Sequence, residues 1–282
     1  MTSAVAAPER GAEGAEEARA VRVNGRRASR ICLVPSLVVG LVVGVVLVIV
    51  GLPVLIASPI FVLVASGLMV WLWRSGPTMV LRALDARPSE ERDRPRLHNV
   101  VDGLCATMGL PRPAICWVES PVPNAMAVGR DPQSATLVVT SALDRALTLV
   151  ELEGVVAHEL VHIKRHDTVV SGVAVVVTAP MSVVTGLPKA AERVHALVGR
   201  GREFSADQRA AGVVRYPPGI ASALLAMVEA GGVATPWPPG RGRTAALTRW
   251  LWVDPMVGMP ADPSAVGELD DTAVRAAAQS LR

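Results

Sequence analysis

The sequence predicts an α+β fold in which an N-terminal transmembrane helical hairpin precedes a mainly helical domain with a small sheet. First, residues 31–73 contain no charged side chain. Second, apolar residues recur at helical spacing over much of the remaining chain, with two short β-favouring runs between them. Third, the composition is 51% apolar but only 3% aromatic. An excess of Val, Leu, Ala and Ile is typical of lipid-facing helices.

The chain divides into four regions. We expect residues 1–30, which are rich in Ala, Glu and Gly, to form a disordered cytoplasmic tail. Residues 31–74 would form the transmembrane hairpin and residues 75–231 the main domain. Residues 232–282 would form a Gly/Pro-rich loop followed by C-terminal helices.

The uncharged run is long enough for two membrane helices, because one span needs about 20 residues. Residues 51–53, Gly-Leu-Pro, are the natural place for the turn between them. Trp71 and Trp73 would then lie at the headgroups, where interfacial aromatic residues are enriched. A cleavable signal peptide is a poor alternative, because the run is too long and begins only after Arg30.

Arginines flank the hairpin, whereas its connecting turn carries no charge. By the positive-inside rule, both ends of the hairpin and the domain that follows are expected in the cytoplasm. The sequence thus predicts a multi-pass protein of the cell membrane whose N-terminus and main domain are both cytoplasmic. The flanking residues are Arg22, Arg26, Arg27 and Arg30 before the hairpin and Arg74, Arg82 and Arg87 after it.

The main domain reads as alternating helices and short strands. A helix is expected to begin with Ser89 as its N-cap and to end at Gly109. Strands are expected at residues 114–120 and 134–143, the first ending in a Pro-Asn turn. A helix over residues 143–167 follows, because its apolar residues recur at helical spacing and its acidic residues precede its basic ones.

The stretch HELVHIKRHD, residues 158–167, predicts a metal site. Residues four apart lie on the same face of a helix, so His158 and His162 can bind one zinc ion at about 2.0–2.1 Å. Glu159 projects about 100° around the helix, beside the metal. There its carboxylate can take a proton from a zinc-bound water molecule, whose pKa the metal lowers towards about 7.

The third histidine of this stretch, His166, cannot join the same ion. It lies eight residues after His158, which is about 12 Å along a helix axis. We expect His166 to be solvated or to support the site indirectly. Asp167 is expected at the helix end or hydrogen-bonded to a metal ligand.

A further ligand is expected from the segment REFSADQRAAG, residues 202–212. Glu203 and Asp207 lie on one face of this predicted helix. Glu203 would complete a His₂Glu site with water in the fourth position. Asp207 would accept a hydrogen bond from a ligand imidazole and fix its tautomer. Taken alone, the segment would rather be read as a solvated acidic helix face, and the HExxH motif upstream favours the ligand role.

These motifs resemble those of the HtpX/Ste24-type membrane zinc metallopeptidases, and more closely their HtpX-like branch. The resemblance covers roughly residues 31–231. It rests on the hairpin and on the stretches PNAMAVG, SATLVVTSAL, ELEGVVAHELVHIKRHD and REFSADQRAAG. It implies a gluzincin-like zinc metallopeptidase domain over residues 75–231 that binds one Zn²⁺ per chain. The implied ligands are His158, His162 and Glu203, with Glu159 as the base.

Two further expectations concern substrate binding. The resemblance places Asn124 near the active site as a substrate-binding residue, although an isolated Asn here is equally a turn residue. Residues 136–140 are either a core strand or the sheet edge to which an extended substrate adds.

The chain also departs from related sequences. The family often has a His-Pro element ahead of an arginine near the C-terminus. This chain has no histidine there, and the resemblance implies Arg275 as the match for the arginine. The antibiotic-sensing membrane metallopeptidases also carry HExxH, but their second motif typically has Cys where Ala206 stands here.

Residues 168–188 are uncharged and long enough for one span. A single crossing would separate His162 from Glu203 by the membrane, and two crossings need about 40 residues. We therefore expect a buried or membrane-dipping hairpin, broken at residues 179–180. Further along, Trp250 and Trp252 are expected in a helix packed on the domain, with a cover over the active site or a bilayer contact as the alternative.

The leading hypothesis is a membrane-anchored zinc endopeptidase that acts on proteins or peptides at the cytoplasmic face. The resemblance implies misfolded or surplus membrane proteins as substrates. One alternative is a catalytically silent membrane adaptor, and another is a signalling metallopeptidase that cleaves one regulator. The partners expected are protein substrates and the lipid bilayer. No nucleic acid is expected, because no Lys/Arg block is present.

Overall fold

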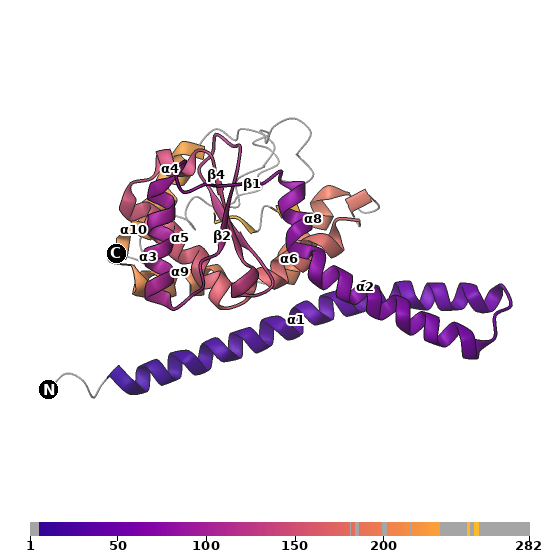
Figure 1. The fold of residues 1–282 in the computed structure, drawn as a ribbon. Coiled ribbons are helices and arrows are strands. Elements are labelled where there is room, and N and C mark those ends of the chain that lie inside the picture. Colours follow the sequence, from indigo (N-terminus) through magenta and orange to yellow (C-terminus); the bar gives the residue numbers. More distant parts are fainter. Residues whose placement is uncertain are drawn as a thin grey trace.

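The computed structural model describes residues 6–180, 182–183, 186–198, 202–214, 216–231, 247–248 and 251–253. A long helical hairpin projects from a mainly helical domain that contains one small sheet (Figure 1). This confirms the predicted fold class. The loop predicted after residue 231, the C-terminal helix, Trp250 and Arg275 lie outside the described residues.

The hairpin consists of α1 (Ala6–Ile49) and α2 (Val54–Ala83). Its turn lies where the sequence predicts it, and Gly51 adopts a φ of 102° that favours glycine. The two helices approach closely at Gly40, where a Cβ would lie 2.9 Å from the Cβ of Ala65. Both helices are long and apolar enough to cross a membrane. Of the most apolar 18-residue segment of each helix, only 22% in α1 and 11% in α2 is buried. Such exposed apolar surface suits a lipid environment.

The N-terminal region differs from the disordered tail expected over residues 1–30. In the structure, residues 6–30 continue α1 without a break. Ala, Glu and Arg dominate this stretch and are strong helix formers. The helix also contacts the domain, as in the ion pair of Glu17 with Lys164 at 3.4 Å. Local propensity together with these contacts explains why this polar segment is ordered.

The sheet has four strands: β1 (Arg87–Pro88), β2 (Ala114–Val118), β3 (Ala125–Val128) and β4 (Thr136–Thr140). Their order is β1-β2-β4-β3, with β2 and β4 parallel and the other two pairs antiparallel. All five residues of β4 are buried. The suggestion that residues 136–140 form a sheet edge is therefore wrong, because β3 pairs outside β4 and is the edge strand among the described residues.

The helix α3 (Pro95–Met108) begins later than expected. Ser89 is not its N-cap, because the backbone N–H of Ser89 donates to the carbonyl of Ile115 on β2. The helix instead begins with Pro95 in its first turn, where proline is favoured. Its end agrees with the prediction, since Gly109 is left-handed with a φ of 65°.

The helix α5 (Leu149–Lys164) is central to the domain and carries the HExxH motif. A capping box starts it, because Thr148 and Glu151 satisfy each other's backbone N–H groups. Helices α3, α9 (Arg202–Val213) and α10 (Pro218–Gly231) pack around α5. The short helices α4 (Leu143–Ala146) and η1 (Pro132–Ser134) lie in connecting segments.

The helix α6 (Asp167–Thr178) lies between the hairpin and the rest of the domain, and α8 (Leu187–Val198) packs against it. The helix α6 contacts α2 through two glycines, because a Cβ on Gly76 of α2 would lie 3.3 Å from the carbonyl carbon of Gly172 of α6. Twelve helical residues span about 18 Å, well short of a bilayer core of about 30 Å. Of the stretch 168–188, which we expect not to cross the membrane, the part up to Thr178 is a buried helix, and this helix ends before residues 179–180.

We expect Gly154→Ala to destabilise the domain. A Cβ at Gly154 would lie 2.9 Å from Cγ1 of Ile220 and 3.0 Å from its backbone nitrogen, so α5 and α10 would have to separate. Overpacking of this kind costs about 1–3 kcal/mol. Gly103→Ala on α3 is the matched control, because no atom lies within 4 Å of its Cβ position. It should stabilise α3 by about 0.5–1 kcal/mol. Thermal unfolding in detergent distinguishes them, and equal shifts would contradict the close approach.

Candidate metal centre

One face of α5 brings His158 and His162 together, with Glu159 beside them. All three side chains are buried, with exposed fractions of 3%, 4% and 2%. The two imidazole rings are 4.8 Å apart between centroids, and their Nε2 atoms are 3.1 Å apart. The spacing of four residues therefore aims both Nε2 atoms at one point, as a helix requires.

The helix α9 supplies a third atom at that point. Glu203 Oε2 lies 3.1 Å from Nε2 of His158 and 3.2 Å from Nε2 of His162. These three residues form a cluster able to hold a metal ion. In a tetrahedral site with bonds of about 2.0–2.1 Å, neighbouring ligand atoms are about 3.3 Å apart. The observed triangle is close to that spacing.

The other ring nitrogens of the two histidines face carboxylates. His158 Nδ1–H donates to Asp207 Oδ1 at 2.7 Å, and His162 Nδ1–H donates to Asp167 Oδ2 at 2.9 Å. These bonds fix both ring orientations and keep a proton on each Nδ1, so that Nε2 is the nitrogen of each ring that can bind a metal ion at the shared point.

The site is built to hold positive charge. Burial lowers the pKa of His158, but its hydrogen bonds to Asp207 and Glu203 outweigh this and raise the pKa to about 10. Burial raises the pKa of Glu203, yet the neighbouring charges of His162 and Arg202 hold it well below the usual value. Two imidazoles among three carboxylates thus retain protons that a divalent ion can replace. The donor set fits a metal ion.

Glu159 is placed differently from the metal-facing residues. Burial raises the pKa of its carboxyl group above the usual value, against the opposing charges of His162 and His158. Within the described part of the chain, no group hydrogen-bonds its carboxylate. Its oxygens are therefore available to a molecule bound at the metal.

Two residues of the site's surroundings were not predicted from the sequence. Arg202 donates through Nε to Glu203 Oε1 at 2.7 Å and through Nη1 to Ser171 on α6, and so fixes the carboxylate. Asn24 of α1 donates to Asp167 Oδ1. The adjacency of Arg202 to Glu203 was a usable signal, whereas nothing near Asn24 in the sequence marks it.

Two predicted residues lie outside the cluster. His166 has a left-handed φ of 58° and is the N-cap residue of α6. It is not part of the metal-facing cluster, as its distance along the helix from His158 predicts. Asn124 is fully buried just before β3. Its side-chain Oδ1 accepts from the backbone N–H of Ala125, and its backbone N–H donates to Thr140 Oγ1. Its contact with a substrate stays a prediction.

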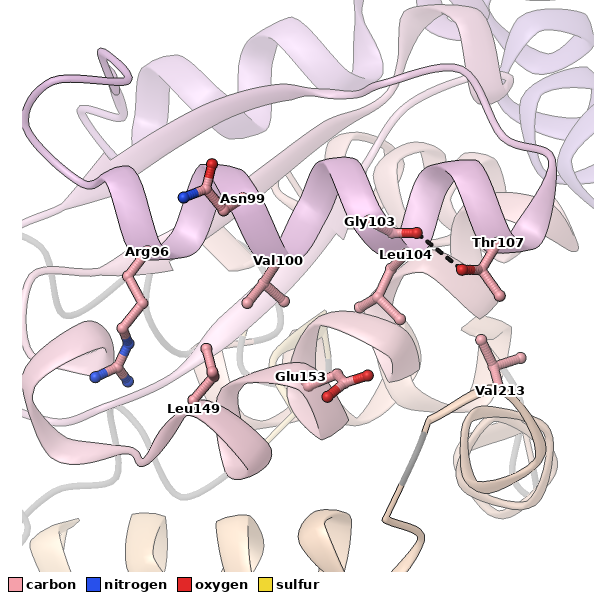
Figure 2. Close-up of a pocket in the computed structure, with 9 residues that line it drawn as sticks. All are labelled: Arg96, Asn99, Val100, Gly103, Leu104, Thr107, Leu149, Glu153 and Val213. Carbon is pink, nitrogen blue, oxygen red and sulfur yellow. Dashed lines mark hydrogen bonds between the residues drawn. The ribbon is translucent and has the colours of Figure 1, made fainter.

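A separate hollow of about 500 Å³ lies between α3, α5 and α9 (Figure 2). Its lining includes Arg96 and Glu153 but none of the metal-facing residues. Arg96 is already engaged, since its Nε lies 3.3 Å from Asp144 Oδ1 and its Nη2 donates to the carbonyl of Leu147. Among the described residues, this hollow is therefore separate from the metal-facing cluster.

Comparison with known proteins agrees with this geometry. The profile of peptidase family M48 matches residues 91–251, more than half of the chain. A Protease HtpX homolog from Pyrococcus furiosus is 33% identical over 182 residues, which cover 54% of this chain and 63% of the relative. Another from Salinibacter ruber is 33% identical over 179 residues, covering 56% and 64%. A third, from Tropheryma whipplei, is 35% identical over 195 residues, covering 58% and 67%.

The matched part is a little under two thirds of the length of the first two relatives. No solved structure matches the chain. The family match includes α5 and α9, which carry the converging His158, His162 and Glu203. On these grounds, the chain belongs to peptidase family M48.

Proposed function

We propose that this protein is a membrane-anchored, zinc-dependent endopeptidase that hydrolyses peptide bonds at the cytoplasmic face. The observation that carries the proposal is the convergence of His158 Nε2, His162 Nε2 and Glu203 Oε2 within 3.2 Å of one another, beside the buried Glu159. This is the donor set of a catalytic zinc site, which keeps its fourth position for water.

Zinc, when bound, lowers the pKa of a coordinated water molecule and polarises the carbonyl of the bond to be cleaved. Glu159 would accept a proton from the attacking water as the water oxygen adds to the carbonyl carbon, and would give that proton to the amine nitrogen as the C–N bond breaks. Its buried carboxylate, next to the two histidines on α5, is within the site rather than exposed to solvent. Asp207 and Asp167 hold the two imidazoles in the orientation that the metal needs.

The edge strand β3 is the surface on which we place the substrate. The backbone N–H of Thr140 donates to the carbonyl of Asn124, so Asn124 faces β4. Because backbone groups alternate in direction along an antiparallel strand, the N–H and C=O groups of Ala125 and Ala127 then point away from β4. Val253 N–H donates to the outward carbonyl of Ala125 at 3.0 Å, and Ala127 is the next outward residue. An extended peptide would add along this edge through main-chain hydrogen bonds with little sequence preference.

The contacts of α1 support the orientation that we propose. Its N-terminal part contacts the domain, as in the pair of Glu17 with Lys164, so both lie on the same side of the bilayer. The arginines that flank the hairpin favour the cytoplasm for this side. The relatives are named as proteases, which supports protein substrates. Because the hairpin anchors the domain at the membrane, misfolded or membrane proteins are the class that we propose.

The proposal is tested with the full chain purified in detergent, supplied with zinc and mixed with an unfolded protein such as reduced casein. We expect cleavage that a zinc chelator abolishes and added zinc restores, with one zinc ion bound per chain. One bound zinc without cleavage would contradict the peptidase and favour the silent membrane adaptor. No bound zinc would contradict the metal site itself.

A further inference from the structure

The cytoplasmic part of α1 reaches the metal centre through one side chain. Asn24 Nδ2 donates to the carbonyl oxygen of Arg165 at 3.0 Å and to Asp167 Oδ1 at 2.5 Å. These residues lie more than 140 positions away in the sequence. A side-chain amide has two N–H donors, so Asn24 uses both of them on the turn between α5 and α6.

Asp167 connects this contact to a predicted metal ligand. Its Oδ1 accepts from Asn24, while its Oδ2 accepts from Nδ1 of His162 at 2.9 Å. Asp167 is only 5% exposed, so its carboxylate depends on protein groups for its hydrogen bonds. A carboxylate that turned away from Asn24 would turn the imidazole of His162 with it.

Other residues of α1 also contact the domain. Glu16 pairs with Arg209 of α9 at 2.5 Å, Glu17 pairs with Lys164 at the end of α5, and Ala28 is buried in a cluster with residues of α6. The side chain of Glu16 is 62% exposed, and exposed ion pairs contribute little. Asn24 differs from them, because it alone in this segment contacts a buried group of the metal centre in the described structure.

We propose that Asn24 is a positioning residue for the metal centre. Asn24 orients Asp167, and Asp167 orients His162, so the first membrane helix helps to position a metal ligand. This inference rests on the proposed zinc peptidase. It gives the hairpin a role besides anchoring, because displacement of α1 removes the support of one ligand. The amide is required for it: an aspartate at this position would place a second carboxylate against Asp167, and a leucine would offer no donor.

The test measures zinc affinity of the full chain in detergent by competition with a chromophoric chelator, and the absorption spectrum of the cobalt-substituted protein. The variants are Asn24→Asp and Asn24→Leu. Two controls lie on the same helix: Gly25→Ala, where no atom is within 4 Å of the Cβ position, and Glu17→Gln, which breaks an ion pair without touching Asp167. Supporting residues of metal ligands typically change affinity about 10- to 100-fold.

We expect both Asn24 variants to weaken zinc binding about tenfold and to change the cobalt spectrum, with both controls like wild type. Asn24→Leu should add little to Asp167→Asn, because both act through one carboxylate. Wild-type affinity in Asn24→Leu, or equal losses in Glu17→Gln, would overturn the inference while the peptidase proposal stands. A wild-type chain that binds no zinc would overturn both. If Asn24→Asp folds poorly, the leucine variant decides.

Discussion

Glu159→Gln is expected to abolish peptide hydrolysis while the zinc content stays at one ion per chain. Glutamine has nearly the same shape but cannot accept the proton of the attacking water. Removal of a general base typically costs about 10²- to 10⁴-fold in rate. Because Glu159 is not among the three converging residues, its loss should leave metal affinity nearly unchanged. Rates with an unfolded protein substrate and zinc content by mass spectrometry measure both effects.

A matched control for this variant is Glu153→Gln on the same helix, whose side chain lines the hollow of Figure 2 and lies outside the metal-facing cluster. It should retain wild-type rates. Activity in Glu159→Gln within a few fold of wild type would show that another group takes the proton. Loss of zinc in the same variant would show that Glu159 belongs to the metal's own ligands.

The core of the site could be predicted because its signal is local. The spacing of His158 and His162 fixes their common face on any helix, and the same argument excludes His166 by axial distance. That Glu203 and Asp207 meet these histidines depends on tertiary packing of α9 against α5, so their sequence spacing alone left a solvated helix face as an alternative. The motifs together, with the family they resemble, made the pairing predictable.

Two errors in the fold share one physical cause. Ser89 looked like an N-cap, but its backbone N–H is used by the sheet and Pro95 starts the helix instead. The strand β3 was missed because AMAV is short and rich in alanine, so residues 136–140 were open to assignment as an edge. In both cases a strand pairing between distant segments decided the outcome, which no local pattern reveals.

The polar start of α1 shows the same limit. Its composition suggested disorder, yet Glu16, Glu17 and Asn24 find partners on helices that follow far later in the chain. Contacts of this kind can be judged only when the facing residues are known. Asn24 therefore carries no signal in the sequence, although it reaches the centre that the sequence marks most clearly.

Glu203→Gln and Asp207→Asn should separate a metal ligand from its support. Glutamine at position 203 removes the negative charge at the metal and the ion pair with Arg202, so zinc affinity should fall by more than about 100-fold, beyond the range of supporting residues. Asparagine at position 207 can donate to Nδ1 of His158 and move its proton to Nε2, which occupies the lone pair that the metal needs.

Because the ligand atoms themselves remain in Asp207→Asn, its zinc affinity should fall by only about 10- to 100-fold. Gln208→Ala, an exposed neighbour on α9, is the control and should bind zinc like wild type. Chelator competition gives all three dissociation constants. Equal losses for the two acidic positions would mean that Asp207 shares the metal with Glu203. A Glu203→Gln variant with wild-type affinity would remove the third ligand from the site and require a different donor to complete it.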